Sequence, residues 1–237
     1  MRLDKALANS GIGTRKDVKK LIKNGKVTVN GVAIKDSAFH LDPYKDAIFI
    51  GPERFVYKKY IYIMMNKPAG VVSATKDNLH KTVIDLLDDK YKHFDLFPAG
   101  RLDIDTCGFV LLTNDGDTAH HITSPARKVN KIYLVTVDGS LDQKAVSSFE
   151  KGLVLDDGYM TLPAELEILD PNAPARALVT IKEGKFHQVK RMFECLGLKV
   201  IFLKRLSMGG IELDESLPYG SYRELTQQEE SKLKNEG

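Results

Sequence analysis

Three charged residues stand directly before an apolar run near the middle of this 237-residue chain. Arg101, Asp103 and Asp105 lie in a short loop, and Phe-Val-Leu-Leu at 109–112 follows it. A short uninterrupted apolar run predicts a buried strand. A carboxylate at the end of a core strand is either a structural group satisfied by hydrogen bonds or a catalytic one. On spacing alone, Asp103 and Asp105 are equivalent candidates for carboxylate chemistry.

Two later segments carry side chains that could complete such a site. The segment 131–137 alternates and is β-branched, which predicts a strand with Tyr133 near its start. The segment 183–193 predicts the opening of a helix that ends at Gly197. This helix is expected to group four basic side chains: Lys185, His187, Lys190 and Arg191.

Lys67 follows the apolar strand predicted over 60–65, where it either approaches an anionic ligand or lies on the rim of a loop. The chain lacks Gly-rich nucleotide-binding loops and a Gly-x-Ser-x-Gly elbow. Its two cysteines form no disulfide framework or metal cluster, and the adjacent His120 and His121 would point about 100° apart on a helix. We therefore expect neither a metal nor a cofactor.

The composition is that of a globular protein, with 43% hydrophobic and 28% charged residues. No apolar run approaches the roughly 18 to 20 residues of a membrane helix, and the first residues lack the apolar centre of a secretory signal. We expect a cytoplasmic monomer without a membrane partner.

Positive charge is concentrated at the N-terminus. Residues 1–26 hold eight Lys and Arg against two Asp, a net charge of +6, so the other 211 residues carry −3 of the overall +3. A basic segment on a near-neutral body indicates a polyanion as partner, although a solvated helix face is the alternative. The basic side chains expected to contact RNA are Arg2, Arg15, Lys16, Lys19, Lys20 and Lys23.

A small domain is predicted over residues 1–58. Helical spacing near the start is followed by a second helix from Thr14 to about Gly25, and Asn30-Gly31 between alternating segments predicts a β-hairpin. Further strands are expected near 39–41 and 47–50, and Gly51-Pro52-Glu53-Arg54 is the best linker candidate.

The larger domain is predicted over residues 59–237, in an α+β chain with a mixed, mostly antiparallel sheet. Its strands and helices follow one another at irregular spacing, which argues against a doubly wound fold. The segments expected to be helical are 82–87, 117–122, 141–150 and the polar end after Thr226; strands are expected over 60–65, 109–112, 131–137, 164–169, 177–181 and 199–206.

Two parts of the chain resemble known proteins. The first 55 or so residues are similar to the RNA-binding domain first recognised in a small-subunit ribosomal protein, on Leu-Asp-Lys, Thr-Arg-Lys and Gly-Lys-Val-Thr-Val-Asn-Gly. The body resembles a pseudouridine synthase of the branch that carries this domain. The motifs are Asn-Lys-Pro-x-Gly from 66, Ala-Gly-Arg-Leu-Asp-x-Asp-Thr from 99, Lys-x-Tyr-x-Val from 131 and Glu-Gly-Lys-x-His-Gln-Val-Lys-Arg-Met from 183.

The resemblance implies an isomerase that detaches uracil from ribose, turns it and rejoins it through carbon. Asp103 is then the essential carboxylate, acting as nucleophile or as base. Tyr133 is the aromatic residue that stacks on uracil. Lys190 takes the place of the family's usual arginine beside Asp103, with Arg191 as the fallback. Asp105 becomes a structural residue, and the substrate-binding residues are Arg101, Lys67, Arg191, Lys185 and His187.

The same resemblance implies ribosomal RNA as partner. The forms Arg-Leu-Asp-Ile-Asp-Thr and Ile-Thr-Ser-Pro are most similar to synthases of small-subunit (16S) RNA. We expect one uridine to be modified within an assembly intermediate of the small subunit. A large-subunit synthase, an enzyme for transfer RNA and a non-catalytic ribosome-associated RNA-binding protein are the alternatives.

Overall fold

The computed structural model describes the backbone of residues 1–235 and the side chains of residues 1–233. Its contacts separate two compact units. The first contains Met1–Ile61 together with Leu87–Leu96, and the second contains Tyr62–Leu86 and the described residues from Phe97 onward. No helix in the part of the chain described has the length and apolar character needed to cross a membrane.

The first unit joins two helices to a four-stranded antiparallel sheet. Helix α2 begins with a capping box in which the Thr14 side chain accepts from the Asp17 amide and Asp17 accepts from the Thr14 amide. The sheet order is β2-β1-β3-β4. The elements are α1 (Leu3–Asn9), α2 (Arg15–Lys23), β1 (Val27–Val29), β2 (Val32–Ala33), β3 (Ile48–Ile50), β4 (Glu53–Phe55) and the short 3-10 helix η1 (Asp89–Tyr91).

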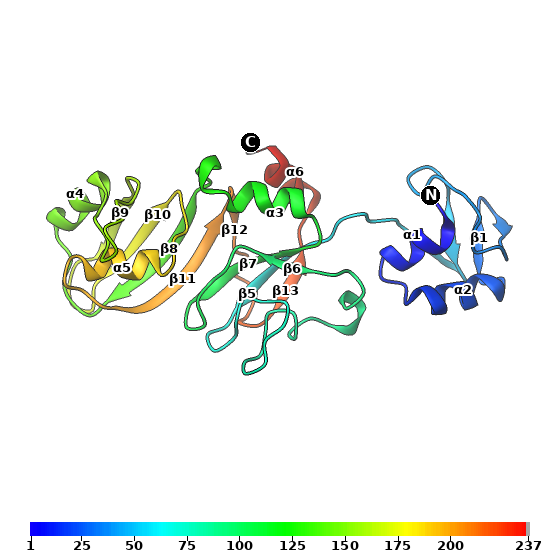
Figure 1. Cartoon of the computed structure of the whole chain (residues 1–237), viewed down its shortest axis with the longest axis horizontal. Coiled ribbons are helices and arrows are strands. Elements are labelled where there is room, and N and C mark those ends of the chain that lie inside the picture. Colours follow the sequence, from blue (N-terminus) through cyan, green and yellow to red (C-terminus); the bar gives the residue numbers. More distant parts are fainter. Residues whose placement is uncertain (236–237) are drawn as a thin grey trace. The chain divides into compact units, whose positions relative to one another are not determined.

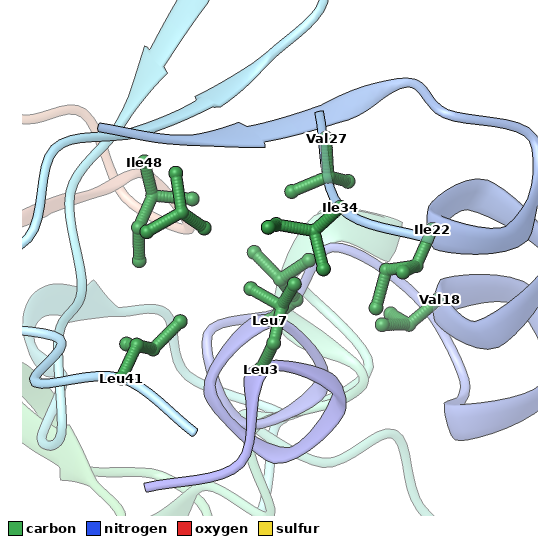
Figure 2. Packing of buried hydrophobic residues seen from close by; sticks show 9 residues of the cluster. Leu3, Leu7, Val18, Ile22, Val27, Ile34, Leu41 and Ile48 are labelled. Atoms are coloured by element: carbon green, nitrogen blue, oxygen red, sulfur yellow. The ribbon is translucent and has the colours of Figure 1, made fainter. Parts of the chain in front are cut away.

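The helices and the sheet of this unit enclose one apolar core. Figure 2 shows Leu3 and Leu7 of α1 and Val18 and Ile22 of α2 facing residues from the sheet side, such as Val27. Burial of this stripe leaves the opposite side of α2 in solvent. The basic side chains that remain exposed there are Arg15, Lys16, Lys19, Lys20 and Lys23.

The interpretation of 51–54 as a linker is wrong. Gly51 and Pro52 form the turn between β3 and β4, and Gly51 adopts φ +58°, which glycine favours. Residues 53 and 54 then pair with β3, with Glu53 opposite Ile50. The strand expected near 39–41 is only an isolated bridge between Arg2 and His40. The boundary predicted after residue 58 stays a prediction.

The second unit is built on a nine-stranded, mostly antiparallel sheet (Figure 1). The strand order is β13-β5-β7-β11-β8-β10-β9, with β12 paired to β11 and β6 paired to β7. Only the β7–β11 pair is parallel among the described strands. The strands are β5 (Tyr62–Lys67), β6 (Phe97–Ala99), β7 (Cys107–Thr113), β8 (Lys131–Val137), β9 (Glu165–Asp170), β10 (Arg176–Ile181), β11 (Val200–Met208), β12 (Ile211–Glu212) and β13 (Tyr222–Glu224). The predicted α+β class is confirmed.

Helices accompany the strands of this sheet (Figure 1). They are α3 (Gly116–Thr123), the 3-10 helix η2 (Pro125–Arg127), α4 (Gln143–Lys151), α5 (Gln188–Glu194) and α6 (Gln227–Asn235). The helix predicted over 82–87 is wrong, because Thr82 forms a bridge with Val72 and bends and turns follow it.

Burial along the strands shows where the core of the second unit lies. Every residue of β5 and β7 is buried, so both faces of the sheet are covered there. Strand β8 alternates, with Lys131, Tyr133, Val135 and Val137 on its buried side. The loop before β7, strand β8 and helix α5 carry the three groups of residues predicted to form the site.

Candidate active site

A pocket of about 410 Å³, open to solvent, lies in the second unit. It is lined by residues from the loop before β7, from β8 and from the segment that leads into α5. Five of the predicted site residues are among them: Arg101, Asp103, Tyr133, Lys185 and His187. The fold therefore gathers side chains that are up to 86 positions apart in the sequence.

The Asp103 carboxylate faces two side chains of the segment around α5. Its Oδ2 lies 3.1 Å from Lys190 Nζ, and its Oδ1 lies 3.5 Å from His187 Nε2. Lys190 also bonds the Oδ1 of Asp105 at 2.6 Å. Burial opposes the charge of Lys190, but its bonds to Asp105 and Asp103 outweigh this and raise its pKa. One ammonium group thus serves both carboxylates, and Asp105 is the more exposed of the two.

Lys67 binds the backbone of the loop that carries Asp103. It is fully buried, and its ammonium group donates to the carbonyl oxygens of Asp103, Ile104 and Thr106 at 3.0, 3.3 and 2.7 Å. Burial lowers its pKa to about 8. The structure places Lys67 where it supports the loop, which does not agree with its predicted contact to substrate.

Two further contacts fix the same loop. The Ser73 hydroxyl accepts from the Leu102 amide and donates to the Leu102 carbonyl, both at 3.1 Å. The Gly70 amide donates to the Ile104 carbonyl at 2.7 Å. Because backbone groups on both sides of Asp103 are held in this way, its carboxylate is presented to the pocket by a rigid loop.

Tyr133 forms part of the pocket wall from the middle of the sheet. It lies on β8 opposite Val179 of β10 and Arg205 of β11. Only 7% of its surface is exposed. Its hydroxyl makes no hydrogen bond within the described part of the chain, so it is free to meet a ligand in the pocket. As an aromatic residue of the pocket lining, Tyr133 is suited to contact a planar base there.

The segment before α5 is a hydrogen-bonded loop. The helix begins at Gln188, later than predicted, so Lys185 and His187 precede it. Gln188 Nε2 donates to Glu183 at 2.8 Å, and its Oε1 accepts from the Lys185 amide at 2.9 Å. Glu183 is itself buried and accepts from Tyr159 Oη at 2.7 Å. The Lys185 ammonium lies over the Tyr159 ring, 4.4 Å from its centroid.

Arg191 lies away from Asp103. Its guanidinium pairs with Asp156 and with Asp157, the latter at 2.8 Å, and both aspartates belong to the loop after α4. These hydrogen bonds raise the pKa of Arg191. Consecutive helical residues point about 100° apart, so Lys190 and Arg191 cannot share one partner. Lys190 is the cation beside Asp103, and Arg191 anchors α5 rather than lining the pocket.

Comparison with known proteins agrees with this geometry. Residues 61–195 match the family RNA pseudouridylate synthase, and residues 1–44 match the S4 domain. The chain belongs to the RNA pseudouridylate synthase family. It is thus a pseudouridine synthase that acts on RNA, an isomerase.

Similar proteins span the whole synthase. An "Uncharacterized RNA pseudouridine synthase YtzG" from Bacillus subtilis is 48% identical over 97% of this chain and 96% of the relative. A "Ribosomal small subunit pseudouridine synthase A" from Vibrio cholerae is 43% identical over 97% of each chain. A solved pseudouridylate synthase is 40% identical, with a TM-score of 0.69 over 98% of this chain and 99% of that one.

The basic residues of the synthase fall in two places. Arg101 lines the pocket with an exposed side chain that has no ion pair within the described residues. The predicted RNA-binding residues lie in the first unit, called the S4 unit below because it contains the residues that match the S4 domain. Five of them are exposed along α2, whereas the Arg2 guanidinium forms a bidentate pair with Asp4 at 2.8 and 3.0 Å. Arg2 is therefore the least available of this set to bind phosphate.

Sequence reasoning missed several contacts in this site. Phe186 stands at the variable position of the motif that begins at Glu183 and is not predicted as a site residue. Glu183 and Gln188 belong to the same motif, but the motif does not predict that their side chains pair. The spacing of Glu183 and Gln188 around a Gly-Lys turn could have indicated a loop closed by side chains. The sharing of Lys190 by Asp105 had no sequence signal. Among the described residues, no cluster of three or more His, Cys, Asp and Glu is arranged to hold a metal.

Proposed function

We propose that this synthase converts one uridine of small-subunit ribosomal RNA into pseudouridine, with Asp103 as the reacting carboxylate. The observation that carries the proposal is that Asp103 lines one pocket together with Tyr133, while its carboxylate lies 3.1 Å from the Lys190 ammonium. The choice of RNA is supported by the 43% identity to the small-subunit synthase of Vibrio cholerae over 97% of the chain.

The reaction needs no added atoms. The bond from uracil N1 to ribose C1′ breaks, the bond from C5 to C1′ forms, a proton leaves C5 and N1 gains one. Asp103 either attacks C1′ or removes the proton from C2′, and both routes start from the ionised carboxylate. Lys190 supplies positive charge when the substrate displaces water from the pocket. We assign to Tyr133 the stacking on uracil, with its hydroxyl available to assist removal of the proton from C5.

The uridine must leave its base stack to enter this pocket, which costs a few kcal/mol. We propose that this free-energy cost is offset by stacking of the uracil on Tyr133 and by attraction to the cations that line the pocket, Arg101 and Lys185. The exposed lysines of α2 add binding to RNA phosphates that does not depend on base sequence. This division gives the catalytic unit the choice of base and the S4 unit much of the affinity.

The test is the conversion of uridine in small-subunit RNA, given either as naked RNA or as a partly assembled particle. Asp103→Asn should lower the single-turnover rate by about 10³-fold or more, since it removes the reacting carboxylate but keeps its shape. RNA affinity should stay near that of the parent protein. Pseudouridine is mapped by sequencing of the treated RNA, with large-subunit RNA and transfer RNA as parallel substrates.

Asp105→Asn is the matched comparison, because it removes a carboxylate that also bonds Lys190 but lies outside the pocket lining. We expect it to keep most of the activity. A full rate in Asp103→Asn would contradict the mechanism. Modification of large-subunit RNA or transfer RNA in preference to small-subunit RNA would contradict the assigned substrate.

A further inference from the structure

Phe186 presents an unusually exposed aromatic ring beside the pocket. Its surface is 74% exposed. Exposed apolar surface forgoes a stabilisation of about 25 cal/mol per Å² that burial would give. The ring stacks on the His187 imidazole, with centroids 3.7 Å apart and planes 20° from parallel. The two rings form a stack with one occupied and one open face.

The backbone under this stack is strained and firmly held. His187 has φ +49° and ψ +29°, the left-handed region that residues other than glycine avoid. Arg191, clamped by Asp156 and Asp157, donates to the Phe186 carbonyl at 3.4 Å. Strain of this kind persists where surrounding contacts enforce it, and it concentrates at functional sites. The fold thus tolerates an unfavourable backbone conformation that holds both rings in this position.

The stack begins at the reacting group and extends outward. The His187 Nε2 atom lies 3.5 Å from Asp103 Oδ1, and its side chain lines the pocket. Phe186 stacks on His187 and is itself outside the pocket lining. Arg101 and Lys185, both exposed, contribute positive charge to the same pocket. An aromatic face next to exposed cations is the combination that binds a nucleotide chain.

We propose that the open face of Phe186 stacks on the base of the nucleotide adjacent to the target uridine. This inference rests on the proposed role of the Asp103 pocket. When the uridine flips out, its neighbour loses a stacking partner, and Phe186 offers a replacement. Stacking of a base on an aromatic side chain is sequence-tolerant and contributes about 5-fold to 150-fold in affinity. Stacking on Phe186 would therefore stabilise the flipped-out uridine whatever the identity of the neighbouring base.

The test combines changes in the protein with changes in the RNA. The substrate is a small-subunit RNA fragment that contains the mapped uridine, either intact or abasic at the nucleotide on its 5′ or 3′ side. Single-turnover conversion gives the rate at saturation and the half-saturating RNA concentration. The full-length protein is compared with Phe186→Ala, Phe186→Leu and Phe186→Tyr. Leu169→Ala is the control, because Leu169 is 47% exposed on β9 and does not line the pocket.

Phe186→Ala should raise the half-saturating concentration of intact RNA by about 10-fold, and Phe186→Leu should do nearly the same because it lacks a flat ring. Phe186→Tyr should retain parent behaviour. For the parent protein, one of the two abasic RNAs should show the same loss, and Phe186→Ala should add nothing further on that RNA. Leu169→Ala should leave both quantities unchanged.

Three results would overturn the proposed stacking of a base on Phe186. Equal losses for Phe186→Ala on intact and abasic RNAs would make Phe186 a structural cover for His187 and Asp103, as would full recovery by Phe186→Leu. An undiminished affinity of the parent protein for both abasic RNAs would exclude base stacking without any change to the protein. These outcomes differ from failure of the proposed function, in which the parent protein forms no pseudouridine in small-subunit RNA.

Discussion

Lys67 shows how one buried charge can hold the loop of Asp103, the proposed reacting residue. Its ammonium group is removed from water and surrounded by backbone carbonyls, three of them from the loop of Asp103. A fourth bond goes to the Pro68 carbonyl at 3.0 Å. Hydrogen bonds to charged groups contribute more than neutral ones, which offsets the cost of burying the ammonium. Asp103 thereby gains a fixed position without a side-chain contact to Lys67.

Lys67→Met should therefore lower both stability and turnover. Four carbonyls lose their donor, and we expect a loss of about 3 kcal/mol in the free energy of unfolding. The rate at saturating RNA should fall because Asp103 is displaced. Lys131→Met is the matched comparison. Lys131 is also buried, but among the described residues its ammonium donates only to the Val129 carbonyl, at 3.0 Å. Its cost in urea denaturation should be smaller.

The stability difference between the parent protein and Lys67→Met should also depend on pH. The pKa of Lys67 is about 8 in the folded state and about 10.4 in the unfolded state. Between these values the unfolded chain binds more protons, so the parent gains stability as pH rises. The difference should be constant below about pH 8 and should widen toward pH 10. A difference that narrows over this range would contradict a buried, charged Lys67.

At the scale of elements, the site depends on a close approach of two strands. Gly108 is the second residue of β7 and pairs with Arg205 of the parallel strand β11. Its φ is +99°, and an added Cβ would lie 2.2 Å from the Arg205 carbonyl oxygen and 2.8 Å from its nitrogen. These are backbone atoms, so a rotamer change cannot relieve the clash. The parallel pairing next to the Asp103 loop therefore requires glycine.

Gly108→Ala should lower the free energy of unfolding by about 3 kcal/mol or more, as overpacking and backbone strain add together. Gly158→Ala is the control, because Gly158 has φ +80° and nothing within 4 Å of the added Cβ. It isolates the strain of the left-handed backbone, about 1 kcal/mol. Equal losses in the thermal unfolding of the two variants would show that β11 yields to the clash.

Strands with a clear hydrophobic pattern could be predicted from the sequence, and short ones could not. The alternation of β8 defined its bounds at 131–137, whereas β6, β12 and β13 have three residues or fewer and were missed. The false helix at 82–87 has a physical origin. Thr82 and Asp85 exchange hydrogen bonds as Thr14 and Asp17 do at the start of α2, so the same cap opens a helix in one place and a turn in the other.

The site was predictable as a set of segments but not as a set of contacts. Motifs identified the loop of Asp103, the strand of Tyr133 and the segment around Lys190. The sequence could not decide between Lys190 and Arg191, because neighbouring helical residues face different partners. Nor could it show that Lys67 is enclosed, since its burial comes from a loop 36 or more residues further along the chain. These choices depend on packing between distant segments.

For the whole molecule, the two compact units are not two continuous stretches of the chain. The first unit contains its own core from Leu3 to Ile48, and it also takes in Leu87–Leu96. That segment buries Tyr91 and Phe94, and Phe94 leaves no room for a Cβ at Gly11. Removal of the first 58 residues would therefore strip the partner from an apolar segment that lies beyond the cut. Point variants of α2 are the better test of the S4 unit.

The variant Lys16→Ala/Lys19→Ala/Lys20→Ala should weaken RNA binding and reduce its salt dependence. These side chains are exposed on α2, and each phosphate contact contributes roughly 0.7 to 0.9 to the slope of log affinity against log salt. The slope should fall by up to about 2 to 3 units, with the saturating rate preserved. The control is Lys144→Ala/Lys151→Ala on α4, which also removes exposed charge. If this pair changes the slope as much per lysine, or if the α2 variant leaves it unchanged, the phosphate contacts lie elsewhere than on α2.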